Sequence, residues 1–100
     1  MAKKTSINNN FLNLAKEETS PKIYPLIARL YNEDRLDLAK LIMKIDYLLE
    51  YTSKCIKIKD YKEAKVSIKA VEDRMDILEK ENVDIEYIKY LYEGIKKKIK

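Results

Sequence analysis

The fold is decided by residues 34–58, DRLDLAKLIMKIDYLLEYTSKCIKI, where apolar side chains recur in alternating steps of four and three. This spacing places them on one side of an α-helix, because side chains return to the same face every three to four residues. The stripe consists of Leu38, Ile42, Ile45, Leu49, Thr52 and Ile56. Other apolar residues broaden it or lie opposite, namely Leu41, Leu48, Cys55, Leu36, Met43 and Tyr47. A helix that is apolar on most of its circumference is typical of the middle of a bundle.

The next stretch predicts a second long helix over residues 60–80. Asp60 followed by Glu63 approximates a capping box, the signal of a helix N-terminus. Apolar residues then define one core face: Tyr61, Ala64, Ile68, Val71, Met75 and Leu78. A thinner stripe of Val66, Ala70 and Ile77 lies nearly opposite, beside Asp73. We therefore expect this helix to make contacts on two sides.

Part of the same region resembles a known repeat. The segment KDYKEAKVSIKAVE, residues 59–72, is similar to the turn and second helix of a tetratricopeptide repeat, in which an aromatic and a small residue lock paired helices. The earlier segment EDRLDLAKLIMKID, residues 33–46, is only loosely similar. It lies about 25 residues away, where that repeat needs about 34, and it lacks the proline that closes each unit. The resemblance implies an antiparallel helix pair and not membership of the family.

The C-terminal stretch predicts a third long helix over residues 84–99, capped by Asp84. Its buried side is defined by Ile85, Ile88, Tyr92, Ile95 and Ile99. At about 100° per residue, Tyr90 lies almost opposite this side, and Tyr87 lies at its boundary. Gly94, one turn after Tyr90, leaves a shallow place beside the ring. The alternative is that Tyr90 only lies over its own helix or covers the N-terminal segment.

The N-terminal part has weaker signals. The first ten residues, MAKKTSINNN, are basic and rich in asparagine, and we expect a flexible arm over residues 1–10. One short apolar face at helical spacing is formed by Ile7, Phe11, Leu12, Leu14 and Ala15. Two prolines then predict a turn over residues 21–24 and a short helix from about Pro25 to Tyr31.

Composition agrees with this sequence of helices. The chain of 100 residues has 38% charged residues, one glycine and two prolines, which favours long helices joined by short polar connections. Short connections force neighbouring helices to run antiparallel. We predict an all-α fold, a small antiparallel bundle of four or five helices in which residues 11–100 form a single domain.

Charge and cysteine content restrict the partners and the compartment. The net charge of +4 comes from 18 lysines and only 3 arginines, and lysine is the weaker choice for bidentate recognition of phosphates or bases. The single Cys55 cannot close an intramolecular disulfide and is interpreted as a small buried hydrophobe. Because we find no targeting segment and no long apolar run, we expect a cytoplasmic protein without membrane insertion.

The sequence offers little for catalysis. It has no histidine, one cysteine and no glycine-rich phosphate loop, so the residues for the usual metal sites, cysteine nucleophiles and nucleotide loops are missing. We expect no enzyme, no cofactor, no metal and no small-molecule substrate.

Two function classes remain. The favoured one is a non-enzymatic helical accessory or adaptor protein that binds a protein partner or a second copy of itself through an apolar helix face. Its candidate residues are Tyr87, Tyr90, Gly94, Val66, Ala70 and Ile77. The alternative is an accessory nucleic-acid-binding protein, or a subunit of a DNA- or RNA-processing machine, that uses lysine-rich surfaces. Its candidate residues are Lys3, Lys4, Lys62, Lys65, Lys69, Lys96, Lys97 and Lys98.

Overall fold

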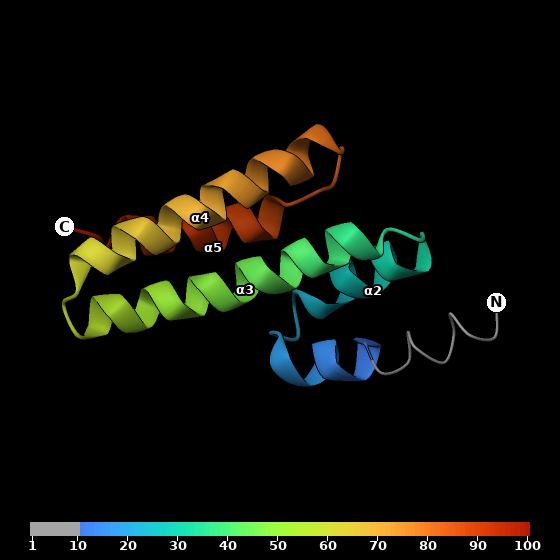
Figure 1. Cartoon of the computed structure of the whole chain (residues 1–100), viewed down its shortest axis with the longest axis horizontal. Helices are drawn as coiled ribbons and strands as arrows, with labels where there is room; N and C mark the ends of the chain where they lie inside the picture. Colours follow the sequence, from blue (N-terminus) through green and yellow to red (C-terminus); the bar gives the residue numbers. More distant parts are fainter. Residues whose placement is uncertain (1–10) are drawn as a thin grey trace. The chain divides into compact units, whose positions relative to one another are not determined.

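The computed structural model describes residues 11–100, and within this range every regular element is a helix. A helix at residues 11–18 is followed by α2 (Tyr24–Asn32), α3 (Leu36–Lys57), α4 (Tyr61–Lys80) and α5 (Glu86–Lys96) (Figure 1). The predicted all-α helical bundle is therefore confirmed. The predicted flexible arm, residues 1–10, lies outside the described residues.

The chain divides into two compact units within α3, the first ending at Met43 and the second beginning at Lys44. The prediction of one domain over residues 11–100 stays a prediction. All candidate residues of the described range lie in the second unit.

The first unit contains the helix at residues 11–18, α2 and the beginning of α3. The Thr19 hydroxyl donates to the Ala15 carbonyl over 2.6 Å where the first helix ends. The Ser20 carbonyl then accepts from the backbone N–H groups of Ile23 and Tyr24, both at 3.0 Å. This is the predicted turn, and α2 begins directly after it with Pro25 in its first turn. Proline is tolerated there because the first helical N–H groups need no intrahelical acceptor.

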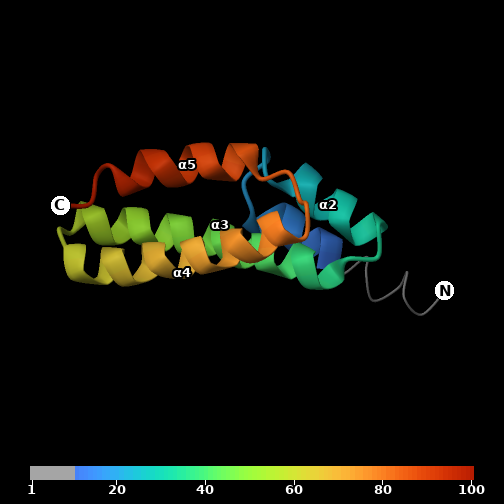
Figure 2. The same cartoon turned by 90° about the horizontal axis from the view of Figure 1, so that it is seen from above.

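The second unit is formed by the rest of α3 with α4 and α5. Contacts between α3 and α4 run in opposite directions along the two helices, since Tyr51 bonds to Glu63 whereas the earlier Leu48 bonds to the later Ser67. These helices are antiparallel, as expected for a short connection (Figure 2). The sequence pattern correctly identifies the core face of α4, since five residues of the stripe are buried: Ala64, Ile68, Val71, Met75 and Leu78.

A pair of hydroxyl groups lies inside the α3–α4 contact. The hydroxyl oxygens of Thr52 and Ser67, both buried, are 2.6 Å apart. Each also lies within hydrogen-bond distance of the Leu48 carbonyl, at 2.7 Å for Thr52 and 3.2 Å for Ser67. Buried polar groups are costly unless they are bonded, and this arrangement satisfies both. The small side chain of Ser67 lets it occupy a core position on α4.

Three of the four helix connections within residues 11–100 share one backbone conformation. Asp34, Lys59 and Asn82 follow the ends of α2, α3 and α4 with φ of 66°, 62° and 60°, the left-handed region. After α3, for example, the N–H of Lys59 donates to Ile56 over 2.9 Å and the N–H of Asp60 donates to Cys55 over 2.8 Å. These two bonds define a Schellman motif, which usually takes glycine at the left-handed position. This chain makes all three turns without glycine.

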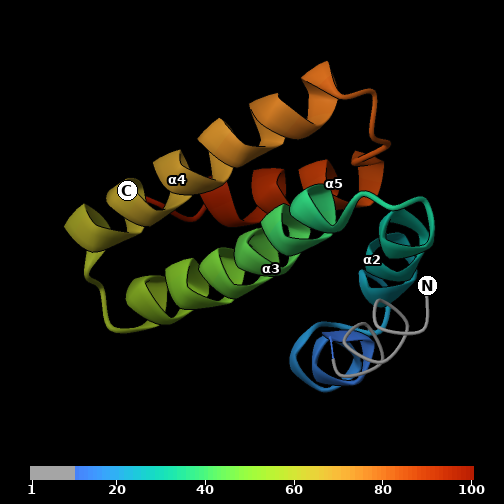
Figure 3. The same ribbon diagram turned by 45° about the vertical axis from the view of Figure 1, so that its right-hand side comes forward.

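Helix α5 is shorter than the predicted range of 84–99. It runs over Glu86–Lys96, so Ile85 and not Asp84 is its N-cap residue, although the Asp84 carboxylate still accepts from the Glu86 N–H over 3.1 Å. At the other end, the N–H groups of Lys98 and Ile99 bond three residues back, which tightens the chain into turns. Figure 3 shows the connection by which α5 folds back beside α4.

Candidate interaction surfaces

The outward face of α5 carries two aromatic rings. Ile88 is buried, whereas Tyr90 is 71% exposed and Tyr87 is 37% exposed. The ring centroids of the two tyrosines are 6.3 Å apart in a stacked arrangement. The helical phase therefore agrees with the predicted one, in which Tyr90 faces out and Tyr87 lies at the boundary.

A shallow depression of about 450 Å³ lies beside Tyr90. Its apolar part is formed by Leu91, Gly94 and Ile95, and charged side chains from Glu93, Lys97 and Lys98 line the rest. A Cβ atom added at Gly94 would have no neighbour within 4 Å. The predicted shallow place therefore exists, and the packing of this chain on itself does not require glycine there.

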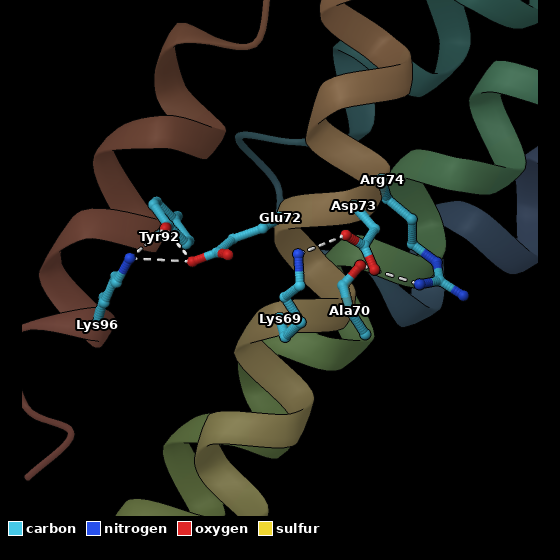
Figure 4. A network of polar contacts seen from close by, with 7 residues as sticks. All are labelled: Lys69, Ala70, Glu72, Asp73, Arg74, Tyr92 and Lys96. Atoms are coloured by element: carbon cyan, nitrogen blue, oxygen red, sulfur yellow. Dashed lines mark hydrogen bonds and ion pairs between the residues drawn. The ribbon is translucent and has the colours of Figure 1, made fainter.

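Tyr92 differs from its prediction as a core residue. It is only half-buried, and its hydroxyl donates to the Glu72 carboxylate on α4 (Figure 4). The phenol is amphipathic, so its ring can cover apolar surface while its hydroxyl reaches the edge of the helix pair. Tyr92 thus joins α5 to α4 by a polar contact at the boundary of the core.

Lys96 completes this cluster. Its Nζ lies 3.0 Å from the Glu72 carboxylate, 3.0 Å from the Tyr92 hydroxyl and 5.4 Å from the centre of the Tyr92 ring. The hydrogen bonds from Tyr92 and Lys96 lower the pKa of Glu72 below its ordinary value. Burial, and next the Glu72 carboxylate, raise the pKa of Tyr92, and the contacts with Tyr92 and Glu72 raise that of Lys96. A second tie, Lys89 to Glu79 at 2.6 Å, joins the same two helices.

The outward face of α4 carries the second apolar stripe predicted from the sequence. Val66 is 63% exposed and Ile77 is 45% exposed, whereas Ala70 is half-buried. Asp73 lies between them along the helix and pairs with Lys69 over 3.1 Å (Figure 4). The structure therefore leaves the large side chains of this stripe in water, and the second contact predicted for this face is not made within the described chain.

The candidate lysines differ in their surroundings. Lys69 and Lys96 line a common pocket with Glu72, Asp76 and Glu79, so the positive charges lie among carboxylates. Lys62 and Lys65 are exposed on α4, and Lys97 and Lys98 lie at the end of α5. Lys3 and Lys4 lie outside the described residues. Lys69 and Lys96 thus lie among acidic groups, which weaken their attraction for phosphate.

Sequence reasoning missed the cross-helix polar contacts. Tyr51 donates to Glu63 over 2.7 Å, and this bond, followed by a weaker effect of Cys55, raises the pKa of Tyr51. The spacing of Tyr92 and Lys96, four residues apart, could have indicated a shared partner, but nothing local indicates that Glu72 is that partner.

Cys55 is buried, as predicted.

Within residues 11–100, no helix is both long enough and apolar enough to cross a membrane. Comparison with protein-family models gives no match for this chain, and neither the curated proteins nor the solved structures contain one that is significantly similar to it.

Proposed function

We propose that the protein is a non-enzymatic helical accessory or adaptor protein that binds a protein partner through the outward face of α5. The observation that carries this proposal is the exposure of Tyr90, 71%, on the side of α5 opposite the buried Ile88. A large aromatic side chain that is left uncovered exposes a large apolar area to water, which is unfavourable. Tyrosine is also enriched at protein interfaces and among the residues that dominate their binding energy.

The surroundings of Tyr90 support the same function. The Tyr87 ring stacks on it from one turn earlier, so that the two rings together form one aromatic surface. The depression next to Tyr90 is lined by both apolar and charged residues. Protein interfaces likewise combine apolar and polar residues.

The test compares two exposed tyrosines. The immobilised protein is used to isolate a partner, and the purified partner is then titrated against the parent and each variant. Tyr90→Ser should weaken binding more than about fivefold, equivalent to about 1 kcal/mol. Tyr47→Ser is the matched control, because Tyr47 is 58% exposed on α3 and stacks on Tyr51 with centroids 6.4 Å apart. Equal affinities for both variants would contradict the proposal.

Gly94 gives an independent arm of this test. Gly94→Ala should stabilise the free protein by about 1 kcal/mol, because alanine is the better helix former and the added Cβ meets no atom within 4 Å. If a partner approaches the helix closely at this position, the same change should weaken its binding. A variant that is more stable and binds as tightly as the parent would place the contact elsewhere.

Nucleic-acid binding is the alternative function. The observation that favours it is the exposure of Lys62 and Lys65 without an ion pair inside the described part of the chain. Titration with a generic duplex at low salt decides it. No binding by the parent protein under these conditions would remove the alternative.

A further inference from the structure

The outer surface of α4 has an uneven distribution of charge. Its first half carries Lys62, Lys65 and Lys69, and its second half carries Asp73 and Asp76 together with Arg74 and, in the last turn, Lys80. Two further carboxylates of the second half, Glu72 and Glu79, are already bonded to lysines of α5. In residues 11–100, Lys62, Lys65 and Asp76 form no ion pair and no side-chain hydrogen bond.

The stability of α4 itself accounts for only part of this distribution. A helix dipole favours carboxylates near the N-terminus and lysines near the C-terminus. Glu63 in the first turn and Lys80 in the last turn agree with this rule, and Lys62 in the first turn does not. The Lys69–Asp73 pair also has the less favourable order, since an acidic residue four positions before a basic one stabilises a helix better. The position of Lys62 and the order of the Lys69–Asp73 pair are therefore not explained by the helix itself.

The apolar stripe on the same surface has the spacing of a helix-pairing seam. Val66, Ala70, Asp73 and Ile77 follow one another in steps of four, three and four, the repeat that keeps one face toward a partner helix. The stripe is also symmetric about a point between Val71 and Glu72. Val66 and Ile77 lie equally far from this point, and so do Ala70 and Asp73. A helix with such symmetry can match its own copy when the two run antiparallel.

We infer that α4 pairs antiparallel with α4 of a second copy, around a two-fold axis near the midpoint of the helix. Val66 of each copy then lies against Ile77 of the other. On one flank of the seam, Asp76 lies level with the space between Lys65 and Lys69 of the second copy. Because a two-fold interface repeats every contact, both the apolar pair and the charge contact occur twice.

The inference rests on the proposed function only in that both assign the protein to protein–protein contacts, and its contact is on α4 instead of α5.

The size of the seam sets the expected affinity of the dimer. A 20-residue helix is about 30 Å long, and one helix pair of this length covers less than the roughly 800 Å² per partner of a stable interface. We expect a weak dimer that forms at hundreds of micromolar protein and that dissociates as salt is added, since its charge contacts lie at the surface.

The experiment uses charge exchange between two variants. One carries Lys65→Glu with Lys69→Glu, and the other carries Asp73→Lys with Asp76→Lys. Each should be monomeric alone by sedimentation equilibrium, because like charges meet across the axis. An equimolar mixture should form a heterodimer at least as tight as the parent dimer. Lys40→Glu with Lys44→Glu on α3 is the control for the change in net charge, and it should leave the dimer intact.

A second pair of variants tests the seam itself. Val66→Asn and Ile77→Asn should each weaken self-association about tenfold or more while circular dichroism and thermal midpoint show an intact fold. A parent protein that is monomeric up to about 1 mM overturns the inference, and so does a mixture that forms no heterodimer. A dimer abolished by Tyr90→Ser and unaffected by the α4 variants also overturns it, and assigns the contact to α5. None of these results removes the proposed binding of a different protein by α5, whose own test is the loss of partner affinity in Tyr90→Ser.

Discussion

Lys59 is held in a backbone conformation that lysine rarely adopts. Its φ of 62° is required by the Schellman motif that ends α3, and a side chain at such a position costs about 1–2 kcal/mol relative to glycine. Lys59→Gly should therefore raise the free energy of unfolding by about 1 kcal/mol, the remainder being offset by the greater freedom of glycine in the unfolded chain. Urea denaturation measures this difference.

The matched control is Lys57→Gly in the last turn of α3, where the conformation is helical. It should destabilise the protein by about 1 kcal/mol, because glycine is the weaker helix former. Effects of the same sign for both variants would contradict the role assigned to the left-handed position. A glycine substitution at Asn82 should stabilise the protein less than Lys59→Gly, because asparagine tolerates the left-handed region better than lysine.

Ile88 and Tyr92 make different kinds of contact from α5, one in the packed core and one at its boundary. Ile88 is almost fully buried, so Ile88→Ala should cost about 3 kcal/mol, as truncations in a packed core do. Tyr92 is half-buried and bonded to Glu72, so Tyr92→Phe should cost about 1 kcal/mol for the lost hydrogen bond and Tyr92→Ala about 2 kcal/mol. Denaturant midpoints of the three variants give the order. A Tyr92→Ala protein as unstable as Ile88→Ala would show that Tyr92 belongs to the core after all.

At the scale of helices, α5 is joined to α4 by a cluster that titrates. The pKa of Glu72 is lowered below its ordinary value of 4.5 in the folded protein, so the unfolded chain binds this proton more readily. The contribution of the cluster is therefore present above pH 4.5 and is lost as the pH falls through the lowered pKa. The raised pKa values of Tyr92 and Lys96 act at the other end of the scale, where stability is lost as the pH rises through them.

Glu72→Gln should make the protein's stability against urea fall less steeply as the pH is lowered. Urea midpoints of the parent should fall between about pH 5 and pH 3, and those of the variant should change less over the same range. Glu17→Gln, on the exposed side of the helix at residues 11–18, corrects for the loss of one carboxylate. If the urea midpoints of Glu72→Gln and of the parent depend on pH in the same way, the cluster of Glu72, Tyr92 and Lys96 does not stabilise the contact of α5 with α4 in solution.

For the whole molecule, the net charge of +4 does not by itself predict nucleic-acid binding. If duplex binding occurs, neutralising Lys62, Lys65 and Lys69 to glutamine should reduce the salt slope by up to about 3, and by about 2 if Lys69 stays with Asp73. Fluorescence titration over a series of salt concentrations measures the slope. An unchanged slope would move the contact to the other candidate lysines.

Spacing along the sequence was enough to predict the order of the helices, the core face of α4 and the outward direction of Tyr90. These features follow from a period of about 3.6 residues, which is a local property that a single stretch of chain contains in full. Val66 and Ile77 were likewise placed opposite the core of α4 by spacing alone. The connections were harder, because Asp34, Lys59 and Asn82 carry no glycine to indicate a left-handed residue.

The contacts between side chains of different helices follow from the packing of the folded chain. Glu72 and Lys96 are 24 positions apart, and Thr52 and Ser67 are 15 apart, so their contact depends on how far each helix is rotated and shifted against its neighbour. That rotation is set by core packing, which no single helix contains. The same packing places Lys69 and Lys96 among carboxylates and makes Tyr92 a boundary residue, because a side chain on the predicted inner face is buried only where another helix covers it.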